Sequence, residues 1–304
     1  MTDWRNLTRK EQEEYLALSD EYQRRTIERR RAQLRQAKAA KRLTPTAVAD
    51  FAFLHMTDDN GRPITPAPHH WLWLELMCNP LIKKLLIMAT PESAKTTWSL
   101  AYLSTEIAFY PEWPHIVACV GGDVAEKRSI TVRNLVETST FQATFPDVQR
   151  AIGMKWHQDE WSVAPEGRPR PGRVHPSLFA VGTGGKIIGS RARLLLADDI
   201  LDFENTRTAN GRETTDTWLH NSFLSRRMSQ VGRAIVIGNA WHHDDSHARM
   251  RRAGDWVVCH VPLLSEEPNV YATIQYPESY RGPKLGEPVA QALEVRDEEN
   301  HDGG

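Results

Sequence analysis

The segment that most constrains the fold spans residues 85–97, where an apolar stretch runs into a short loop and then into Lys95-Thr96. The spacing from Ala89 to this pair matches the phosphate-binding loop G-x-x-x-x-G-K-[ST], with alanine at both glycine positions. In such a loop, backbone N–H groups and a helix N-terminus bind a polyphosphate, the lysine reaches the terminal phosphates, and the hydroxyl binds Mg²⁺. We therefore expect a strand, a loop and a helix in this order.

The two alanines leave a second interpretation open. Alanine is disfavoured where φ must be positive, so the pattern alone also fits an ordinary strand–loop–helix in which Lys95-Thr96 only caps the helix. If the loop binds a nucleotide, the residues that form the site are Ala89, Pro91, Glu92, Ser93, Ala94, Lys95, Thr96 and Thr97.

The composition indicates a globular protein of the cytoplasm. With 304 residues, 40% of them hydrophobic, we expect a single substantial α/β domain with appendages. The formal net charge of −1 excludes a generally basic protein. The three cysteines lie far apart, in neither a disulfide nor a metal-ligand pattern, which is typical of a reducing compartment. The amino terminus is hydrophilic and no apolar run has membrane-spanning length, so we expect neither a signal peptide nor a membrane helix.

The first 42 residues are interpreted as a separate polar segment. They contain no glycine or proline and are rich in Glu, Gln, Arg and Ala, which favours a long helix. Between Tyr22 and Arg42, nine basic residues are opposed only by Glu28. This helix either packs partly on the domain with a solvated outer face, or contacts a partner protein or DNA phosphates.

From residue 81 onward, apolar strand-like stretches alternate with helix-like stretches. Buried strands separated by helices predict a mostly parallel sheet with helices on both faces. We expect strands at 85–88, 115–120, 160–164, 177–181, 193–197, 234–237 and 256–261, and helices at 71–77, 95–109, 123–140, 212–228 and 244–252. We expect 43–80 to be mostly irregular apart from one helix, and the chain beyond Pro262 to be loop-like with an acidic end.

A second segment with chemical potential is the apolar strand at 193–197, which ends in Asp198 and Asp199. In magnesium-dependent NTPases one carboxylate holds the metal, and the next orients and deprotonates the attacking water. We assign Asp198 to the metal and Asp199 to catalysis, although the two roles are exchangeable and such pairs also cap helices. A phosphate loop followed about a hundred residues later by this strand predicts a P-loop NTPase of the additional-strand class.

A third segment, at 235–245, is an apolar strand that ends in Gly238-Asn239. Asn239 fits the sensor position of such ATPases, where it would contact the γ-phosphate; a plain role at a helix start is the alternative. A rival interpretation assigns a metal site to the side chains that follow, in which His243 and His247 would share coordination at i, i+4 on a helix. No glutamate base or third ligand completes a zinc site, and capping of the next helix by Asp244 explains the acids more simply. The candidate ligands are His242, His243, Asp244, Asp245 and His247.

In their order and spacing, these segments resemble the large subunit of terminase, the DNA-packaging motor of tailed double-stranded DNA phages. The resemblance covers roughly residues 45–265. It includes the variant loop at 91–97, the acidic strand at 194–199 and a segment at 238–245 that is similar to the coupling motif of the family. Further matching motifs are Pro68-His69-His70-Trp71, Phe145-Pro146-Asp147, Val181-Gly182-Thr183-Gly184-Gly185 and Gly189-Ser190-Arg191-Ala192.

The resemblance implies an ATPase that uses Mg²⁺ and drives double-stranded DNA into a procapsid through the portal, in the host cytoplasm. It implies the portal protein and the small terminase subunit as partners. It also implies a homo-oligomeric ring assembled on the portal, from a subunit that we expect to be a monomer in isolation. Arg191 resembles the arginine that such motors insert into a neighbour's site, with Arg193, Arg207, Arg226 and Arg227 as alternatives. His70 and Trp71 resemble the motif on the adenine side.

Two departures from the family pattern are notable. Asp199 stands where many packaging ATPases carry glutamate. Only about forty residues follow Leu264, too few for the nuclease that usually follows, so we expect the nuclease on a separate polypeptide or the chain to be truncated. The expected organisation is a helical segment at 1–42, an ATPase domain at 43–265 and a linker-like acidic tail at 266–304. A related helicase-like remodelling ATPase, and a non-catalytic DNA-binding or assembly module with a degenerate loop, are the alternative functions.

Overall fold

The computed structural model describes residues 9–187, 189–262 and 272–285, and for residues 9–18 only the backbone. Among these residues, no helix is long and apolar enough to cross a membrane. The α-helices are α1 (Arg9–Ala39), α2 (Pro45–His55), α3 (Pro68–Cys78), α4 (Lys95–Phe109), α5 (Gly122–Glu137), α6 (Ser139–Thr144), α7 (Phe203–Thr206), α8 (Ala209–Trp218) and α9 (Ser246–Ala253). The strands are β1 (Lys84–Ala89), β2 (His115–Cys119), β3 (Val148–Arg150), β4 (Glu160–Trp161), β5 (Val163–Pro165), β6 (Leu178–Gly182), β7 (Leu194–Asp198), β8 (Arg233–Gly238), β9 (Val257–Val261) and β10 (Thr273–Gln275).

The centre of the fold is an eight-stranded sheet in the order β10-β9-β1-β8-β7-β2-β6-β4. The six inner strands are parallel, and the edge strands β10 and β4 are antiparallel to their neighbours. β8 is inserted between β1 and β7, so that Leu86 pairs with Val236 and Val236 in turn with Ala197. This inserted strand defines the additional-strand class of P-loop folds, and the predicted α/β fold class is therefore confirmed.

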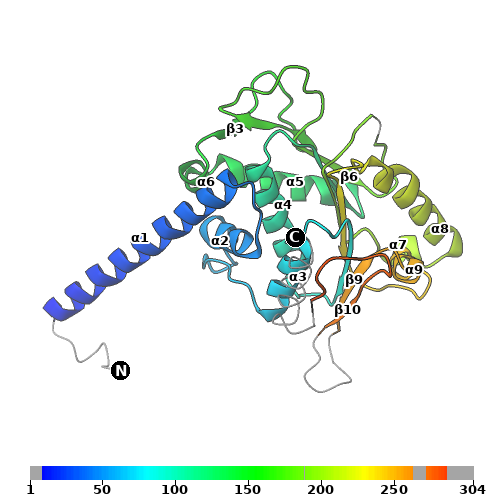
Figure 1. Cartoon of the computed structure of the whole chain (residues 1–304), viewed down its shortest axis with the longest axis horizontal. Helices are drawn as coiled ribbons and strands as arrows, with labels where there is room; N and C mark the ends of the chain where they lie inside the picture. Colours follow the sequence, from blue (N-terminus) through cyan, green and yellow to red (C-terminus); the bar gives the residue numbers. More distant parts are fainter. Residues whose placement is uncertain (1–8, 188, 263–271, 286–304) are drawn as a thin grey trace, which may run out of the picture.

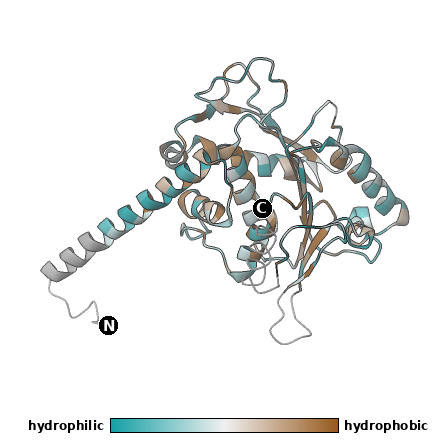
Figure 2. Cartoon of the chain, viewed as in Figure 1, coloured by the Kyte–Doolittle hydropathy of each residue, from teal (hydrophilic) through white to brown (hydrophobic). Residues whose placement is uncertain are grey.

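Helices cover both faces of the sheet (Figure 1). One face carries α2 to α6, and the other carries α7 to α9. The two faces bury separate hydrophobic clusters, one around α4 and one around Trp218 and Trp256. Figure 2 shows the hydrophobic strands in the interior, with hydrophilic residues concentrated on helices such as α1 and α9. The central strands β1, β7 and β8 are nearly continuous hydrophobic runs because both of their faces are buried.

Helix α1 extends away from the rest of the molecule and contacts it through its carboxyl-terminal half (Figure 1). Leu34 is fully buried, Lys38 pairs with Asp147 at 2.6 Å, and Arg30 pairs with the buried Asp50 of α2. The expected long polar helix is therefore present, and among its described side chains those of residues 20–25 form an unbroken exposed run. Lys38 and Arg30 use part of its basic charge in structural contacts.

Several sequence-based boundaries were wrong, each for a local reason. The stretch expected to be mostly irregular contains α2, which begins with Thr44 as N-cap and Pro45 in the first turn. The expected strand at 160–164 is two strands that pair in different sheets, on either side of Ser162. The expected helix at 212–228 ends as an α-helix at Trp218 and continues as a π-helical turn and a 3₁₀ turn to Arg226.

The two remaining differences concern a helix break and an edge strand. The expected helix at 123–140 stops at Glu137, because the Thr138 hydroxyl accepts from the Phe141 N–H and starts α6. The stretch expected to be loop-like after Pro262 contains β10. The acidic residues 294–302 lie outside the described part of the chain.

Candidate nucleotide-binding site

The loop between β1 and α4 adopts the strained backbone that the glycines of a phosphate loop usually supply. Ala94, at the second glycine position, has φ +57°, and Glu92 has φ +62°. Ala89, at the first glycine position, is the last residue of β1 and does not have a positive φ. The left-handed conformation costs a non-glycine residue roughly 1–2 kcal/mol, and such strain concentrates at functional sites. Alanine at these positions therefore does not prevent the loop from forming.

The imidazole of His70 stabilises this loop through a hydrogen bond to its backbone. Its Nδ1 accepts from the Ala67 N–H at 3.0 Å, so its Nε2 carries the proton and donates to the Ser93 carbonyl at 3.0 Å. Burial lowers the pKa of His70 to about 4, which keeps the ring neutral in this role near pH 7. The ring also packs against Trp98 of α4, with 5.2 Å between ring centroids. Trp71, the neighbouring residue in the motif, is 38% exposed.

Lys95 begins α4 and is almost completely buried, at 6% exposure. Its ammonium donates to the Thr90 carbonyl at 2.7 Å and to the Asn239 side-chain oxygen at 2.9 Å. Burial lowers its pKa, against the opposing effect of the nearby carboxylates Asp199 and Asp198. The cation is thus held by two neutral oxygens and not by a carboxylate ion pair.

Asp198 ends β7 directly beside the start of α4. Its two carboxylate oxygens accept from the Thr96 hydroxyl at 3.3 Å and from Arg128 Nε at 3.1 Å. The residue is 1% exposed, and burial, with the adjacent Asp199 as second cause, raises its pKa. Arg128 and Thr96 oppose this rise by stabilising the ionised form.

Arg128, on α5, is a residue of this site that sequence analysis missed. The buried positions of its helix are Ala125, Ser129, Val132 and Val136, and Arg128 lies on the flank of this face. No motif surrounds it, and the helix that carries it is separated from Asp198 by 70 residues in the chain. Only the packing of α5 on β2 and β6, with β7 as the next strand, reveals the contact.

Asp199 has a strained backbone that is fixed by both neighbouring strands. Its φ is +49°, its N–H donates to the Ile237 carbonyl at 2.9 Å, and its carbonyl accepts from the Val120 N–H at 3.0 Å. Its Oδ1 is buried and has no hydrogen-bond partner among the described residues. A buried carboxylate oxygen without a donor is costly, so it indicates a place for a cation or a donor that the chain itself does not supply.

Asn239 follows β8 and lies between the two parts of the site. Its side chain accepts from Lys95, and its carbonyl lies 2.9 Å from His247 Nδ1. His247 is fully buried, and burial lowers its pKa, so the neutral ring donates this bond. The ring packs against Gly238, where an added Cβ would lie 2.5 Å from His247 Cε1. Only glycine fits there, and His247 is therefore a second residue that sequence analysis did not place in this role.

The expected cap of α9 was wrong by one residue. Asp245, not Asp244, is the N-cap: its carboxylate accepts from the Ala248 N–H at 2.8 Å and from the N–H groups of Trp241 and His242. Asp244 instead binds Arg249 and Arg252, and the Arg249 hydrogen bond is the main cause that lowers its pKa to about 2.

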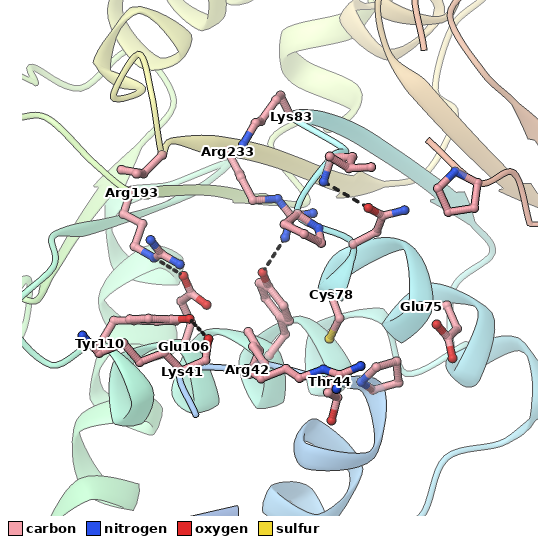
Figure 3. A pocket seen from close by; sticks show the side chains of 18 of the residues that line it. Lys41, Arg42, Thr44, Glu75, Cys78, Lys83, Glu106, Tyr110, Arg193 and Arg233 are labelled. Carbon is pink, nitrogen blue, oxygen red and sulfur yellow. Dashed lines mark hydrogen bonds and ion pairs between the residues drawn. The ribbon is translucent and has the colours of Figure 1, made fainter. Parts of the chain in front are cut away.

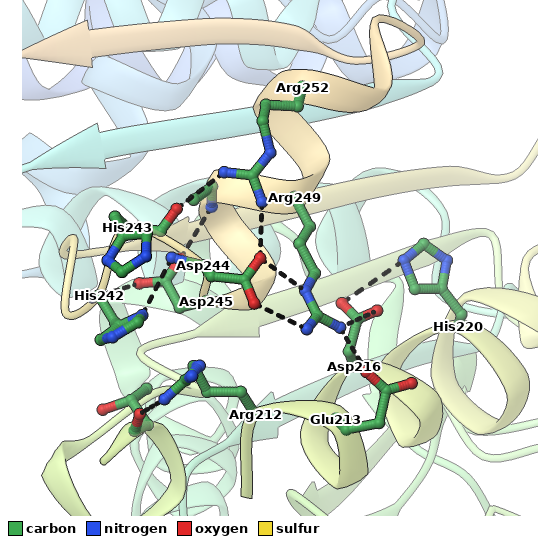
Figure 4. A network of polar contacts seen from close by, with 12 residues as sticks. Arg212, Glu213, Asp216, His220, His242, His243, Asp244, Asp245, Arg249 and Arg252 are labelled. Atoms are coloured by element: carbon green, nitrogen blue, oxygen red, sulfur yellow. Dashed lines mark hydrogen bonds and ion pairs between the residues drawn. The ribbon is translucent and has the colours of Figure 1, made fainter. Parts of the chain in front are cut away.

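Arg249 connects this segment to α8 (Figure 4). Besides Asp244, it binds Glu213 at 2.8 Å and Asp216 at 3.2 Å. The metal interpretation of these residues is not supported, since the described part of the chain contains no group of three His, Cys, Asp or Glu side chains that could hold a metal ion. His243 precedes α9 and is not on a helix, so the expected i, i+4 pair with His247 is absent.

Arg191 is not brought to the same place. It is exposed and precedes β7, whereas Asp198 ends that strand, about 13 Å farther along at the usual rise per residue. The alternative Arg193 is paired with Glu106 at 2.6 Å and lies over the Tyr110 ring, at the amino end of the strand. Neither arginine can complete the site of its own chain, and a role of Arg191 in a neighbouring subunit stays a prediction.

The grouped side chains fit a magnesium ion by their chemistry. Thr96 Oγ1, Asp198 and the unpartnered Asp199 Oδ1 are all oxygen donors, which Mg²⁺ prefers. They lie at the carboxyl edge of a parallel sheet and beside a helix N-terminus, the usual place for ligands in such folds. The site thus combines a cationic lysine, two carboxylates, a hydroxyl and an amide from three distant segments.

Comparison with known proteins gave matches in structure. No protein-family model matches the chain, and no curated protein sequence matches it. The large terminase ATPase domain of Thermus phage P74-26 is 14% identical over 62% of this chain and 67% of its own, with a TM-score of 0.43. The large terminase of bacteriophage HK97 is 14% identical over 83% of this chain, with a TM-score of 0.49. The match covers 52% of the HK97 chain, so this chain spans about half of that protein's length.

Proposed function

We propose that the chain is a magnesium-dependent ATPase. The observation that carries this proposal is the convergence of Lys95, Asp198 and Asp199 at one edge of the sheet, although they come from segments about a hundred residues apart. Lys95 is almost completely buried without a carboxylate ion pair, and Asp199 Oδ1 is buried without a hydrogen-bond partner. An ordinary helix start explains neither observation. Both are explained if a polyphosphate and its metal occupy the space between them.

Each residue has a proposed role that follows from its contacts. Lys95 would exchange its bonds to Thr90 and Asn239 for bonds to the β- and γ-phosphates, because a charged oxygen is the stronger acceptor. The N–H groups of residues 90–97 would bind phosphate oxygens at the start of α4. Asn239, released from Lys95, would contact the γ-phosphate.

The acidic pair would divide the remaining chemistry. When bound, Mg²⁺ would neutralise the charge of the β- and γ-phosphates. Thr96 and Asp198 are the residues proposed to hold it. Asp199, whose Oδ1 is free to accept, would orient the attacking water and take its proton. His70 would position the loop without touching the phosphates, with Trp71 beside it on the adenine side.

We further propose that hydrolysis drives double-stranded DNA through a portal, as in phage genome packaging. The sequence motifs support this proposal, and it includes a ring of identical subunits, the portal protein and a small terminase subunit. Arg191, exposed before β7, is available to a neighbouring subunit in such a ring. We retain the proposed division into a helical segment at 1–42, an ATPase domain at 43–265 and a tail at 266–304.

The test is the rate of DNA-stimulated ATP hydrolysis, measured in the presence of portal and DNA so that interfacial groups are supplied. Lys95→Ala and Asp198→Asn should each lower the rate by about 100-fold or more. Matched controls are Lys127→Ala and Asp123→Asn on the exposed surface of α5, which should hydrolyse ATP at the wild-type rate. If Lys95→Ala and Asp198→Asn also match the wild type, the proposed site is wrong.

A further inference from the structure

A polar cavity lies at the amino ends of the central parallel strands, opposite the candidate nucleotide-binding site at their carboxyl ends (Figure 3). Its volume is about 810 Å³, and its wall includes the residues that precede β1, the starts of β7 and β8 and the connection between α1 and α2. Six cationic side chains and two acidic ones line it. These are Lys41, Arg42, Lys83, Arg193, Arg233 and Lys284, with Glu75 and Glu106. We call this cavity the basic pocket.

Two of these cations are explained by the fold. Arg233 is buried and donates to the carbonyls of Met77, Ile82 and Leu76 and to the Tyr102 hydroxyl, so it satisfies the end of α3. Arg193 is paired with Glu106 and stacks on Tyr110 (Figure 3). The positive charge of Arg233 is nevertheless balanced by no carboxylate within ion-pair distance among the described residues.

Three of the other cations have no such explanation. Lys41, Arg42 and Lys83 are exposed, and among the described residues none of them has a carboxylate partner within 4 Å. Lys83 faces Arg233, Arg227 and Arg193, whose repulsion adds to burial in lowering its pKa. Like charges placed together cost free energy unless an anion binds between them.

The backbone around these cations is held in place. The Lys41 carbonyl accepts from the Tyr110 hydroxyl at 2.8 Å, and the Arg42 N–H donates to the Ala37 carbonyl at 2.9 Å. Lys83 is fixed by its carbonyl, which accepts from the Ala234 N–H at 2.9 Å. A fixed backbone reduces the entropy that these residues lose on binding, so this arrangement suits a ligand with several negative oxygens.

We propose that the basic pocket is a phosphate-binding site, separate from the nucleotide site at the other edge of the sheet. Its ligand carries at least two phosphate groups, which are either those of a small polyphosphate or successive backbone phosphates of a nucleic acid. Arg42 and Lys83 bind these groups directly, and the buried Arg233 adds its charge from below.

The experiment uses the full chain with Lys95→Ala, in EDTA, so that binding at the nucleotide site is removed first. Inorganic tripolyphosphate is titrated calorimetrically at low ionic strength, where screening is weak. We expect one tripolyphosphate per chain, and an affinity about tenfold lower or worse after Arg42→Gln with Lys83→Gln, since each charged hydrogen bond is worth that much. A short DNA duplex is titrated in the same way to distinguish the two phosphate sources.

The matched control is Arg24→Gln with Lys155→Gln, which changes the net charge equally at exposed positions outside the pocket. The control should bind as the parent chain does, and thermal melting should show that both pairs of variants remain folded. Dependence of either probe on Arg42 and Lys83 supports the proposal and identifies the source. If neither probe depends on them, or if the control loses as much affinity, the proposal is overturned. Because Lys95→Ala is the starting point, this result is independent of the outcome for the nucleotide site.

Discussion

The parallel strands of the central sheet begin at its amino edge and end at its carboxyl edge. Each of these two edges carries a buried cation, and the two cations are stabilised in different ways. At the amino edge, Arg233 donates four hydrogen bonds to backbone carbonyls and a tyrosine, so every partner is part of the framework. At the carboxyl edge, Lys95 donates to one carbonyl and to the side chain of Asn239. The first cation makes four bonds with its five N–H groups, all to the framework, whereas the second is held by partners that a stronger acceptor can replace.

This difference separates charges that stabilise the fold from charges that are ready to bind a ligand. The same contrast holds among the carboxylates. Glu106, near the amino edge, is paired with Arg193, while Asp199 at the carboxyl edge has a strained backbone and an oxygen without a partner. Burial and charge alone therefore do not identify the site. What distinguishes it is a buried carboxylate oxygen without a donor close to a buried lysine without a carboxylate partner.

The largest expected effect is on catalysis at the carboxyl edge. Asp199→Asn should lower the DNA-stimulated ATPase rate by about 10²–10⁴-fold, because the amide cannot take a proton from water. Equilibrium binding of ATP should change little, since Lys95 and the loop remain. Steady-state rates and nucleotide titrations of the same preparation measure both. An unchanged rate would assign Asp199 to the fold and remove the contrast with Glu106.

The next effect is on stability and should fall on the other edge. Arg233→Met leaves three carbonyls and the Tyr102 hydroxyl without their donor, so the free energy of unfolding should fall by about 3 kcal/mol or more. Lys95→Met should change it by less than about 1 kcal/mol, because its partners are fewer and replaceable. Urea unfolding followed by circular dichroism measures both. Equal losses in the two variants would mean that both cations are structural.

Acid should destabilise the amino edge through His115, which begins β2. Burial lowers the pKa of this fully buried histidine to about 3, from an ordinary value near 6.5. The unfolded chain therefore binds a proton that the folded chain does not, and its stabilising contribution is complete above pH 6.5 and is lost as the pH falls toward 3. Between pH 7 and pH 5 this amounts to about 2 kcal/mol.

Unfolding of the wild type and of His115→Gln at both pH values measures this contribution. The variant should lose about 2 kcal/mol less than the wild type on acidification, whatever its stability at pH 7. Equal acid sensitivity of the two chains would show that His115 does not contribute to the pH dependence of this edge.

The smallest effect concerns backbone strain in the loop. Ala94→Gly should raise the free energy of unfolding by about 0.5–1 kcal/mol, because glycine adopts φ +57° without the steric cost. Ala89→Gly is the matched control, and it should lower stability by a similar amount since this residue is in a strand. Thermal melting of the two variants compares them. If both substitutions changed the free energy of unfolding in the same direction, the conclusion that Ala94 is strained would be contradicted.

Much of the sheet was predictable from the sequence because its inner strands are buried on both faces and appear as unbroken apolar runs. The start of α4 at Lys95 and its end at Phe109 were predicted correctly for the related reason that its apolar residues are dense. The divided strand around Ser162 was not predictable, since its two halves pair with segments that lie far apart in the sequence.

Within the site, the chain's own order of motifs predicted that Lys95 and Asp198 would meet, and the geometry places both at one edge. Arg128 was missed, and His247 was considered only as a metal ligand, because the contact of each depends on how a helix packs against a strand end. The cap at Asp245 instead of Asp244 was a one-residue error, since adjacent acids compete for the same position and only the backbone of the turn decides between them.

The most direct test of the account is a crystal structure of the wild-type chain with Mg²⁺ and a non-hydrolysable ATP analogue. The account predicts the triphosphate at the carboxyl edge, between the loop at 90–96 and Asp198, with Lys95 moved from Asn239 onto the phosphates. A loop without nucleotide, with Lys95 still bound to Thr90 and Asn239 while the analogue lies elsewhere, would contradict it.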